Sequence, residues 1–115
     1  VDIRYNPVSR YKPDFSKANL REAVEKEGIE YIHRPDLGVP TDVRKASVGK
    51  DSREDIWTWY DSNVISTFTN GNFNHFLNSM DYPIALMCVE QDPTACHRHR
   101  LFLALKEKGL IGFDL

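Results

Sequence analysis

The 115-residue sequence has little that would place it in a specialised class of protein. It has only two cysteines, too few for a disulfide scaffold in a chain of this size, and a cytosolic setting would keep both reduced. No apolar run approaches the roughly 20 residues needed to span a bilayer, and no charged and then apolar signal segment opens the chain. We find no internal repeat and no low-complexity segment. These absences favour a cytoplasmic location without membrane contact.

An excess of charge of one sign is also missing. Fifteen Lys and Arg against 17 Asp and Glu leave a net charge of -2, which argues against bulk electrostatic binding of nucleic acid or of an anionic membrane. A local basic patch is still allowed. The 41% hydrophobic and 28% charged fractions are those of an ordinary globular protein. We expect one domain over residues 1–115, long enough for a core but short for a complete doubly wound sheet.

Three short segments are predicted to be strands. Residues 84–89 begin as a continuous apolar run, residues 1–5 alternate with Val1 and Ile3 facing one way and Asp2 and Arg4 the other, and residues 29–33 form a second short strand. A helical pattern separates residues 1–5 from residues 29–33. A strand, helix, strand order with so long a crossover implies parallel pairing with a right-handed connection. We therefore predict an α/β fold, with a short parallel sheet, flanking helices and a Rossmann-like arrangement in three layers.

Capping residues and glycines mark the predicted helices. The first runs from Ser16 to Gly28, and its expected buried stripe is Leu20, Ala23 and Val24. The second begins at the capping pair Asp51 and Glu54, and its expected apolar face is Ile56, Trp59, Tyr60, Val64 and Phe68. A shorter helix follows from Phe73. Two stretches show no helical period: residues 35–50, expected to be a lid or a peripheral excursion, and residues 111–115, an edge strand or a tail.

The last predicted helix follows the strand at residues 84–89. Asp92 is expected to be its N-cap, Pro93 occupies its first position, and Gly109 stops it. Residues 96–98 then fall in its first turns. Helix N-termini present unpaired N–H groups and a partial positive charge, and the arginines nearby add full charges. This region therefore suits an anion.

The ligand crevice of an open α/β sheet lies beyond the carboxyl ends of its strands. The predicted order brings Arg4 and the following loop, then His33 and Arg34, then residues 88–98 to that edge. Arginine forks clamp phosphates or carboxylates, and a histidine changes its charge near neutral pH. We expect Glu90, His97 and Cys96 to be catalytic, and Arg4, Ser9, Arg10 and Arg98 to bind substrate.

Two other interpretations use the same residues. In the first, the arginines pair with Asp2, Glu90 and Asp92 in a structural ion network. In the second, Cys88, Cys96, His97 and His99 form a thiol or metal site. The spacing argues against metal, because adjacent residues on a helix point about 100° apart and structural zinc sites favour pairs two to four residues apart. We therefore expect no metal and no cofactor, with Cys96 a perturbed thiol and Cys88 a small core residue.

The sequence resembles the domain-of-unknown-function family numbered 488. The closing run that carries the resemblance is Cys88, Glu90, Asp92, Pro93, Cys96, His97 and Arg98. The opening residues that match are Asp2, Arg4, Pro7, Ser9 and Arg10, followed by Phe15, Leu20, Gly28, Ile29, Tyr31, Leu37 and Gly38. Val39 departs from the pattern, where a second glycine is expected. The chain also begins inside the family's Asp-x-Arg strand, so the strand and helix that usually precede it are expected to be missing here.

The resemblance implies a fold and a candidate site but no reaction. Our first hypothesis is an enzyme that binds a phosphate-bearing or other anionic ligand, such as a nucleotide or a nucleic-acid end. The second is a non-catalytic module that binds such a ligand in the same pocket. The third is a thiol or metal site built on Cys88 and Cys96.

Overall fold

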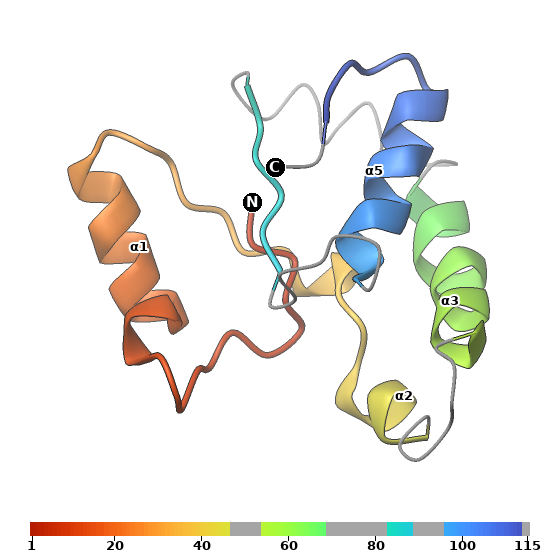
Figure 1. The fold of residues 1–115 in the computed structure, drawn as a ribbon, viewed down its shortest axis with the longest axis horizontal. Coiled ribbons are helices and arrows are strands. Elements are labelled where there is room, and N and C mark those ends of the chain that lie inside the picture. The colour runs from red at the N-terminus through yellow and green to blue at the C-terminus, as the bar shows by residue number, and fades with distance from the viewer. Residues whose placement is uncertain (47–53, 69–82, 89–95, 114–115) are drawn as a thin grey trace.

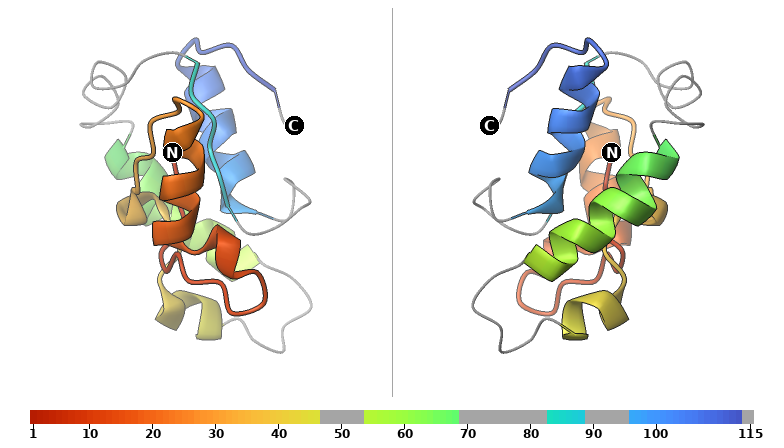
Figure 2. Two further views of the ribbon diagram at one scale, coloured as in Figure 1. Left: turned by 90° about the vertical axis from the view of Figure 1, so that its left-hand side faces the viewer. Right: turned by 90° about the vertical axis from the view of Figure 1, so that its right-hand side faces the viewer.

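The computed structural model describes residues 1–46, 54–68, 83–88 and 96–113, and it places helices around three extended segments (Figure 1). Helix α1 lies on one side of these segments, and α3 and α5 lie on the other (Figure 1). Figure 2 views the same arrangement from the α1 side and from the α3 side. The elements are η1 (Pro13–Phe15), α1 (Lys17–Lys26), η2 (Pro35–Leu37), α2 (Thr41–Ala46), α3 (Glu54–Tyr60), the π-helical turn η3 (Asp61–Ile65) and α5 (His97–Glu107).

The predicted α/β fold is wrong, because the described part of the chain is mainly helical and contains no sheet. The extended segments pair only at two isolated bridges, Asp2 with His33 and Asp2 with Met87. Both bridges are parallel, which confirms the predicted direction of these segments. Two bridges do not make the strands of a Rossmann-like layer.

A side-chain hydrogen bond of Asp2 and the start of η2 end the pairing after one residue. The backbone N–H of Ile3 donates to the carbonyl of Met87 at 3.1 Å, and the N–H of Arg34 donates to the carbonyl of Asp2 at 2.8 Å. The next amide along the first segment, that of Arg4, donates instead to the Asp2 carboxylate at 3.1 Å. Pro35 has no N–H and begins η2. The ladder therefore stops where a strand would have continued.

Helix α1 confirms the predicted position but not the predicted packing. It follows Ser16 and ends before Gly28, whose φ of +78° is the left-handed conformation expected after a helix. All of residues 17–26 are described and none of them is buried, so the predicted buried stripe is wrong. The Ser16 hydroxyl accepts from the backbone N–H of Ser9 at 2.9 Å and makes no helix cap. The hydrogen bond between Ser9 and Ser16 therefore joins the N-terminal end of α1 to the loop that precedes η1.

The stretch predicted as one long loop contains η2, α2 and part of the core. Leu37, Gly38 and Val39 are all buried, so the residue that replaces the expected second glycine is a core side chain. Its short elements escaped prediction because a single turn shows no repeating apolar period. Residues 47–50 lie outside the described part of the chain.

The core lies between α3, α5 and the extended segments. Four residues of the predicted α3 face are buried at helical spacing: Ile56, Tyr60, Val64 and Phe68. They pack with Ile3, Leu37, Val39 and the α5 residues Leu101 and Leu105. Arg100 of α5 forms an ion pair with Asp61 of η3 and lies over the Trp57 ring, 5.6 Å from its centroid. The two helices are therefore joined by both apolar and polar contacts.

Helix α5 begins later than predicted. Its first residue is His97 and its N-cap is Cys96, so the predicted start at Asp92 and Pro93 is wrong. Gly109, with a φ of +97°, confirms the predicted end. Asp51, Asp92, the predicted helix from Phe73 and residues 114–115 lie outside the described residues, and residues 111–113 form no strand. None of the described helices is long and apolar enough to cross a membrane.

Gly38→Ala is expected to destabilise the protein by about 1–3 kcal/mol, as overpacking of a core does. An added Cβ would lie 2.6 Å from the backbone nitrogen of Tyr5 and 2.8 Å from the carbonyl oxygen of Ile3. Backbone atoms are unable to move aside cheaply. Urea unfolding measures the decrease in the free energy of unfolding. Gly112→Ala is the matched control, because its Cβ would meet at 3.0 Å only the end of the Phe102 side chain. Equal stability of the two variants would contradict the close approach.

Candidate functional site

Cys96 lies at the start of α5 but is not part of the helix. Its φ of -126° and ψ of 144° are extended, and its Sγ accepts a hydrogen bond from the backbone N–H of Arg98 at 3.4 Å. A thiol sulfur therefore occupies the position usually taken by a serine or aspartate oxygen. The 100° rule for adjacent helical residues does not apply to Cys96 and His97, which removes one sequence argument against a shared site.

Cys88 joins this pair from a separate segment. It ends the described stretch 83–88, which the bridge between Asp2 and Met87 fixes in the centre of the molecule. The Cys88 sulfur lies 3.7 Å from each ring nitrogen of His97, and the Cys96 sulfur lies 3.8 Å from Nδ1. The ligand-type atoms of Cys88, Cys96 and His97 all lie within 4.8 Å of one another, and all three residues are buried. We call these three residues the Cys–His cluster.

The environment of His97 defines which nitrogen carries its proton. Nε2 lies 3.2 Å from the carbonyl oxygen of Ile3. A carbonyl oxygen only accepts, so Nε2 is assigned as the N–H donor and Nδ1 as the acceptor. The lone pair of Nδ1 is therefore not used by the Ile3 carbonyl. This is the tautomer that a metal ligand at Nδ1 requires.

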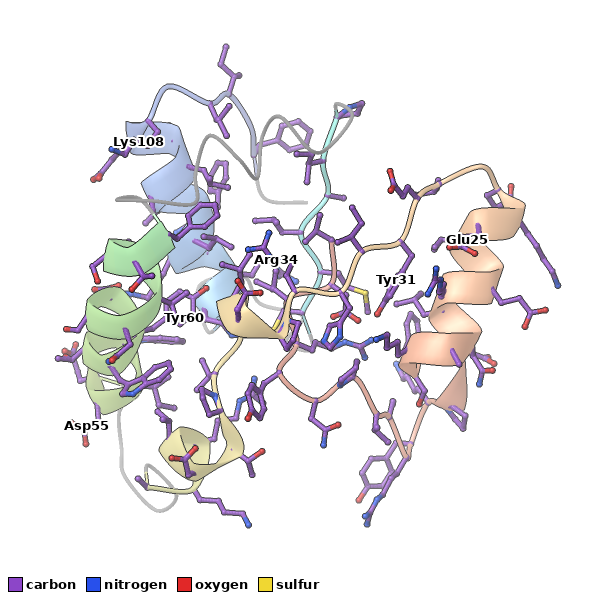
Figure 3. All side chains as sticks on the ribbon, turned by 180° about the vertical axis from the view of Figure 1, so that it is seen from behind. Glu25, Tyr31, Arg34, Asp55, Tyr60 and Lys108 are labelled. Carbon is purple, nitrogen blue, oxygen red and sulfur yellow. The ribbon has the colours of Figure 1, made fainter. Side chains whose placement is uncertain are left out.

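Tyr60 closes the cluster on the α3 side. Figure 3 shows Tyr60 extending from α3 toward the start of α5. Its ring centroid lies 5.3 Å from that of His97 at an interplanar angle of 56°, and its hydroxyl donates to the Leu37 carbonyl at 2.7 Å. Burial raises the pKa of Tyr60 far above its usual value, so this side chain stays a neutral phenol. The Tyr60 ring therefore packs against His97 as an apolar surface, and its hydroxyl already has a hydrogen-bond acceptor.

The hydrogen bond with Cys96 and burial together raise the pKa of the Cys88 thiol. Cys88 is therefore protonated at neutral pH, and a protonated thiol is a poor nucleophile.

The predicted arginine clamp is not assembled in the described residues. Arg4 is buried and donates to both carboxylate oxygens of Asp2, with Nε to Oδ1 at 2.8 Å and Nη2 to Oδ2 at 2.7 Å. Arg4 therefore pairs with Asp2, as the ion-network alternative expects, whereas Glu90 and Asp92, the other carboxylates of that network, lie outside the described residues. Arg10 is exposed in the loop before η1, and Arg98 is partly buried at the start of α5.

The other predicted residues are dispersed. Ser9 is part of the loop before η1, where its hydroxyl accepts from the backbone N–H of Lys12 at 3.1 Å. The His33 Nε2 lies 2.8 Å from the Arg4 carbonyl, and Arg34 pairs with Asp36 at 2.7 Å. Glu90 lies outside the described residues. Of the seven predicted site residues, the described structure brings only Cys96 and His97 together in the Cys–His cluster.

Sequence reasoning missed three partners, the Ile3 carbonyl, Tyr31 and Tyr60. Tyr31 donates to the Asp2 carboxylate through its hydroxyl. Burial alone would raise the pKa of Asp2, but the hydrogen bonds from Arg4 and Tyr31 together hold that pKa below its usual value. A backbone carbonyl leaves no sequence signal, and the two tyrosines carry none that separates them from ordinary core residues.

A comparison with models of known families matches residues 1–105 to the family described as "Domain of unknown function DUF488". No curated protein matches the chain, and no solved structure matches it.

Arg4→Met is expected to destabilise the protein by about 3–5 kcal/mol, since it leaves a buried carboxylate without its cation. Urea unfolding measures the change. Arg21→Met is the control, because Arg21 pairs with Glu25 on the exposed surface of α1, where such a pair contributes about 0.3–0.5 kcal/mol. A fully stable Arg4→Met variant would contradict the structural role of the Asp2–Arg4 pair.

The pH dependence of stability is expected to carry the signature of Asp2. A carboxyl group whose pKa is lowered on folding stabilises the protein above the unfolded pKa of about 4 and loses that contribution as the pH falls through the folded pKa. The stability difference between the wild type and Asp2→Asn should therefore be largest at pH 5–7 and shrink below about pH 4. Urea unfolding from pH 3 to 7 tests this, and a difference independent of pH would contradict it.

Proposed function

This chain belongs to DUF488, a family of unknown function, and we propose that it is a metal-binding protein whose centre consists of Cys88, Cys96 and His97. The observation that carries the proposal is the burial of three ligand-type atoms within 4.8 Å of one another, two of them sulfurs that come from separate segments. Zinc is the metal we expect. The sequence disfavoured a metal on spacing, but that argument placed Cys96 inside a helix.

The distances in the cluster fit tetrahedral coordination. With a metal–sulfur distance of about 2.3 Å, a metal–nitrogen distance of about 2.0–2.1 Å and tetrahedral angles, a sulfur and a nitrogen ligand lie about 3.6 Å apart. His97 Nδ1 lies 3.7 Å from the Cys88 sulfur and 3.8 Å from the Cys96 sulfur. The Cys88 sulfur also lies 3.7 Å from Nε2, so coordination through Nδ1 requires the imidazole ring and this sulfur to shift relative to one another.

The contact between His97 and Ile3 matches the outer shell of known metal sites. A histidine ligand usually donates its second ring N–H to a carbonyl or a carboxylate, which fixes the tautomer and makes the ligand more basic. The Ile3 carbonyl, 3.2 Å from Nε2, is placed for that role. The cluster therefore supplies a preset tautomer as well as the donor atoms.

Charge favours a divalent metal. Two thiolates and a neutral imidazole carry a charge of -2, so Zn²⁺ makes the buried centre neutral, whereas a monovalent ion such as Cu⁺ leaves a net negative charge. An isolated charge buried in a protein interior is costly. The buried ion pair of Asp2 with Arg4 is neutral as a whole and does not change this balance. A reducing, cytoplasmic setting would keep both thiols available.

The centre has three ligand-type side chains among the described residues, the number that catalytic zinc sites use. Such sites leave the fourth position for water or substrate. The anionic ligand expected from the sequence, such as a nucleotide or another phosphate-bearing molecule, would have a place there. Catalysis on that ligand is a proposal that depends on the metal being present.

Protein produced with zinc and a thiol reductant is expected to retain about one equivalent of zinc, the content of a mononuclear site. Cys88→Ser, Cys96→Ser and His97→Gln should each reduce the zinc content well below one equivalent, as measured by elemental analysis. His99→Gln is the matched control, because that imidazole lies two residues further along α5 and outside the cluster. Absence of zinc from protein with intact thiols would overturn the proposal.

Cobalt substitution tests the coordination directly. Thiolate-to-cobalt charge-transfer bands should appear in the wild type and weaken in each cysteine variant. Addition of phosphate or a mononucleotide should change the visible d–d bands if the fourth position takes an anion. If the d–d bands do not change on addition of either anion, the proposed metal site still stands but the proposal that it binds an anionic ligand is overturned.

A further inference from the structure

We infer that Asp2, Arg4 and Tyr31 form a positioning cluster that fixes the Ile3 carbonyl and, through it, the orientation and tautomer of His97. The inference rests on the proposed function, because the consequence of this positioning is tighter metal binding by the Cys–His cluster. Asp2, Arg4 and Tyr31 are positioning residues, because none of them is a member of the Cys–His cluster that would bind the metal.

The Asp2 side chain closes over Ile3. Its Oδ1 accepts from the backbone N–H of Arg4 at 3.1 Å and from the Arg4 Nε at 2.8 Å, while Oδ2 accepts from the Arg4 Nη2 at 2.7 Å. These bonds join the residues on either side of Ile3 into a small ring. The peptide groups next to Ile3 therefore have little freedom to rotate, and its carbonyl keeps one direction.

The backbone of the same segment is held from both sides. The Asp2 N–H donates to the Ile32 carbonyl at 2.8 Å, and the Ile3 N–H donates to the Met87 carbonyl at 3.1 Å. A Cβ on Gly38 would come within 2.8 Å of the Ile3 oxygen, so the Gly38 backbone packs closely against this carbonyl. The acceptor of His97 is thus fixed by bonds on two sides and by packing on a third.

Tyr31 is the member of the cluster that reaches toward the surface. Figure 3 shows it between the central segments and α1, and its hydroxyl donates to Asp2 Oδ2. Burial and the bond to Asp2 raise the pKa of Tyr31 to about 12, so the phenol remains a donor at neutral pH. Removal of this hydroxyl keeps the Asp2–Arg4 ion pair but loosens the carboxylate that closes over Ile3.

Tyr31→Phe is the test, with Tyr11→Phe as the matched control because Tyr11 is 99% exposed. Two properties are measured in each protein: the ring ¹⁵N shifts of His97 without metal, and the zinc dissociation constant by competition with a chromophoric chelator. Wild type and control should show His97 protonated at Nε2 alone. Tyr31→Phe should show a mixture of tautomers and a roughly threefold to tenfold rise in the dissociation constant, less than the 10–100-fold change typical of a direct outer-shell partner.

The outcomes separate this inference from the proposed function. Zinc binding by the wild type with unchanged His97 shifts and affinity in Tyr31→Phe would overturn the inference and leave the metal site. No zinc binding by the wild type would overturn the proposed function, while the metal-free ¹⁵N shifts would still decide whether Tyr31 positions His97. Lower thermal stability with unchanged shifts would assign Tyr31 a purely structural role and overturn the inference. If Tyr31→Phe does not fold, Arg4→Lys replaces it, since lysine keeps the charge but loses the two-bond fork.

Discussion

The Asp2 carboxylate closes onto Arg4 and holds a buried ion pair between the extended segments. Asp2 and Arg4 are 1% and 4% exposed, so both charges have left water, at a cost that only a full set of hydrogen bonds can offset. The carboxylate receives that set from the Arg4 backbone, the Arg4 guanidinium and the Tyr31 hydroxyl. The segment that carries the pair then bridges the two neighbouring extended segments and supplies the acceptor for His97.

The same closure explains why alternating apolar and polar residues did not produce a sheet. A strand needs each outward amide for its neighbour, whereas the Arg4 amide is used by a side chain two residues earlier. Aspartate competes with a neighbouring strand for backbone N–H groups, because its side chain is short and its carboxylate is a strong hydrogen-bond acceptor. The predicted parallel direction of the segments is correct, since crossover length and connection handedness do not depend on how many residues pair. The prediction that these segments form strands of a sheet is wrong.

Helix positions were predictable where the signal is local, and packing was not. Gly28 and Gly109 take the left-handed conformation that ends α1 and α5, and the α3 face follows the helical period through Ile56, Tyr60 and Val64. The start of α5 was missed because cysteine is not among the preferred N-cap residues, although its sulfur accepts the Arg98 N–H here. The stripe of Leu20, Ala23 and Val24 on α1 was wrongly predicted to be buried, because burial needs a partner that no single helix pattern specifies.

For the candidate site, the sequence supplied the residues but not their arrangement. Cys88, Cys96 and His97 were all noticed, yet the geometry that unites them depends on one extended backbone at Cys96 and on the Ile3 carbonyl.

The distances within the Cys–His cluster help to decide whether its three residues only fill the core or also suit a metal ion. A buried imidazole nitrogen needs a hydrogen-bond partner, and thiols are weak donors. Nδ1 of His97 faces two of them at 3.7 and 3.8 Å, longer than a strong hydrogen bond but close to the edge of a tetrahedral metal site. A divalent ion at the centre would replace two weak contacts by coordinate bonds and neutralise both thiolates. This difference is the physical argument for the metal that we propose.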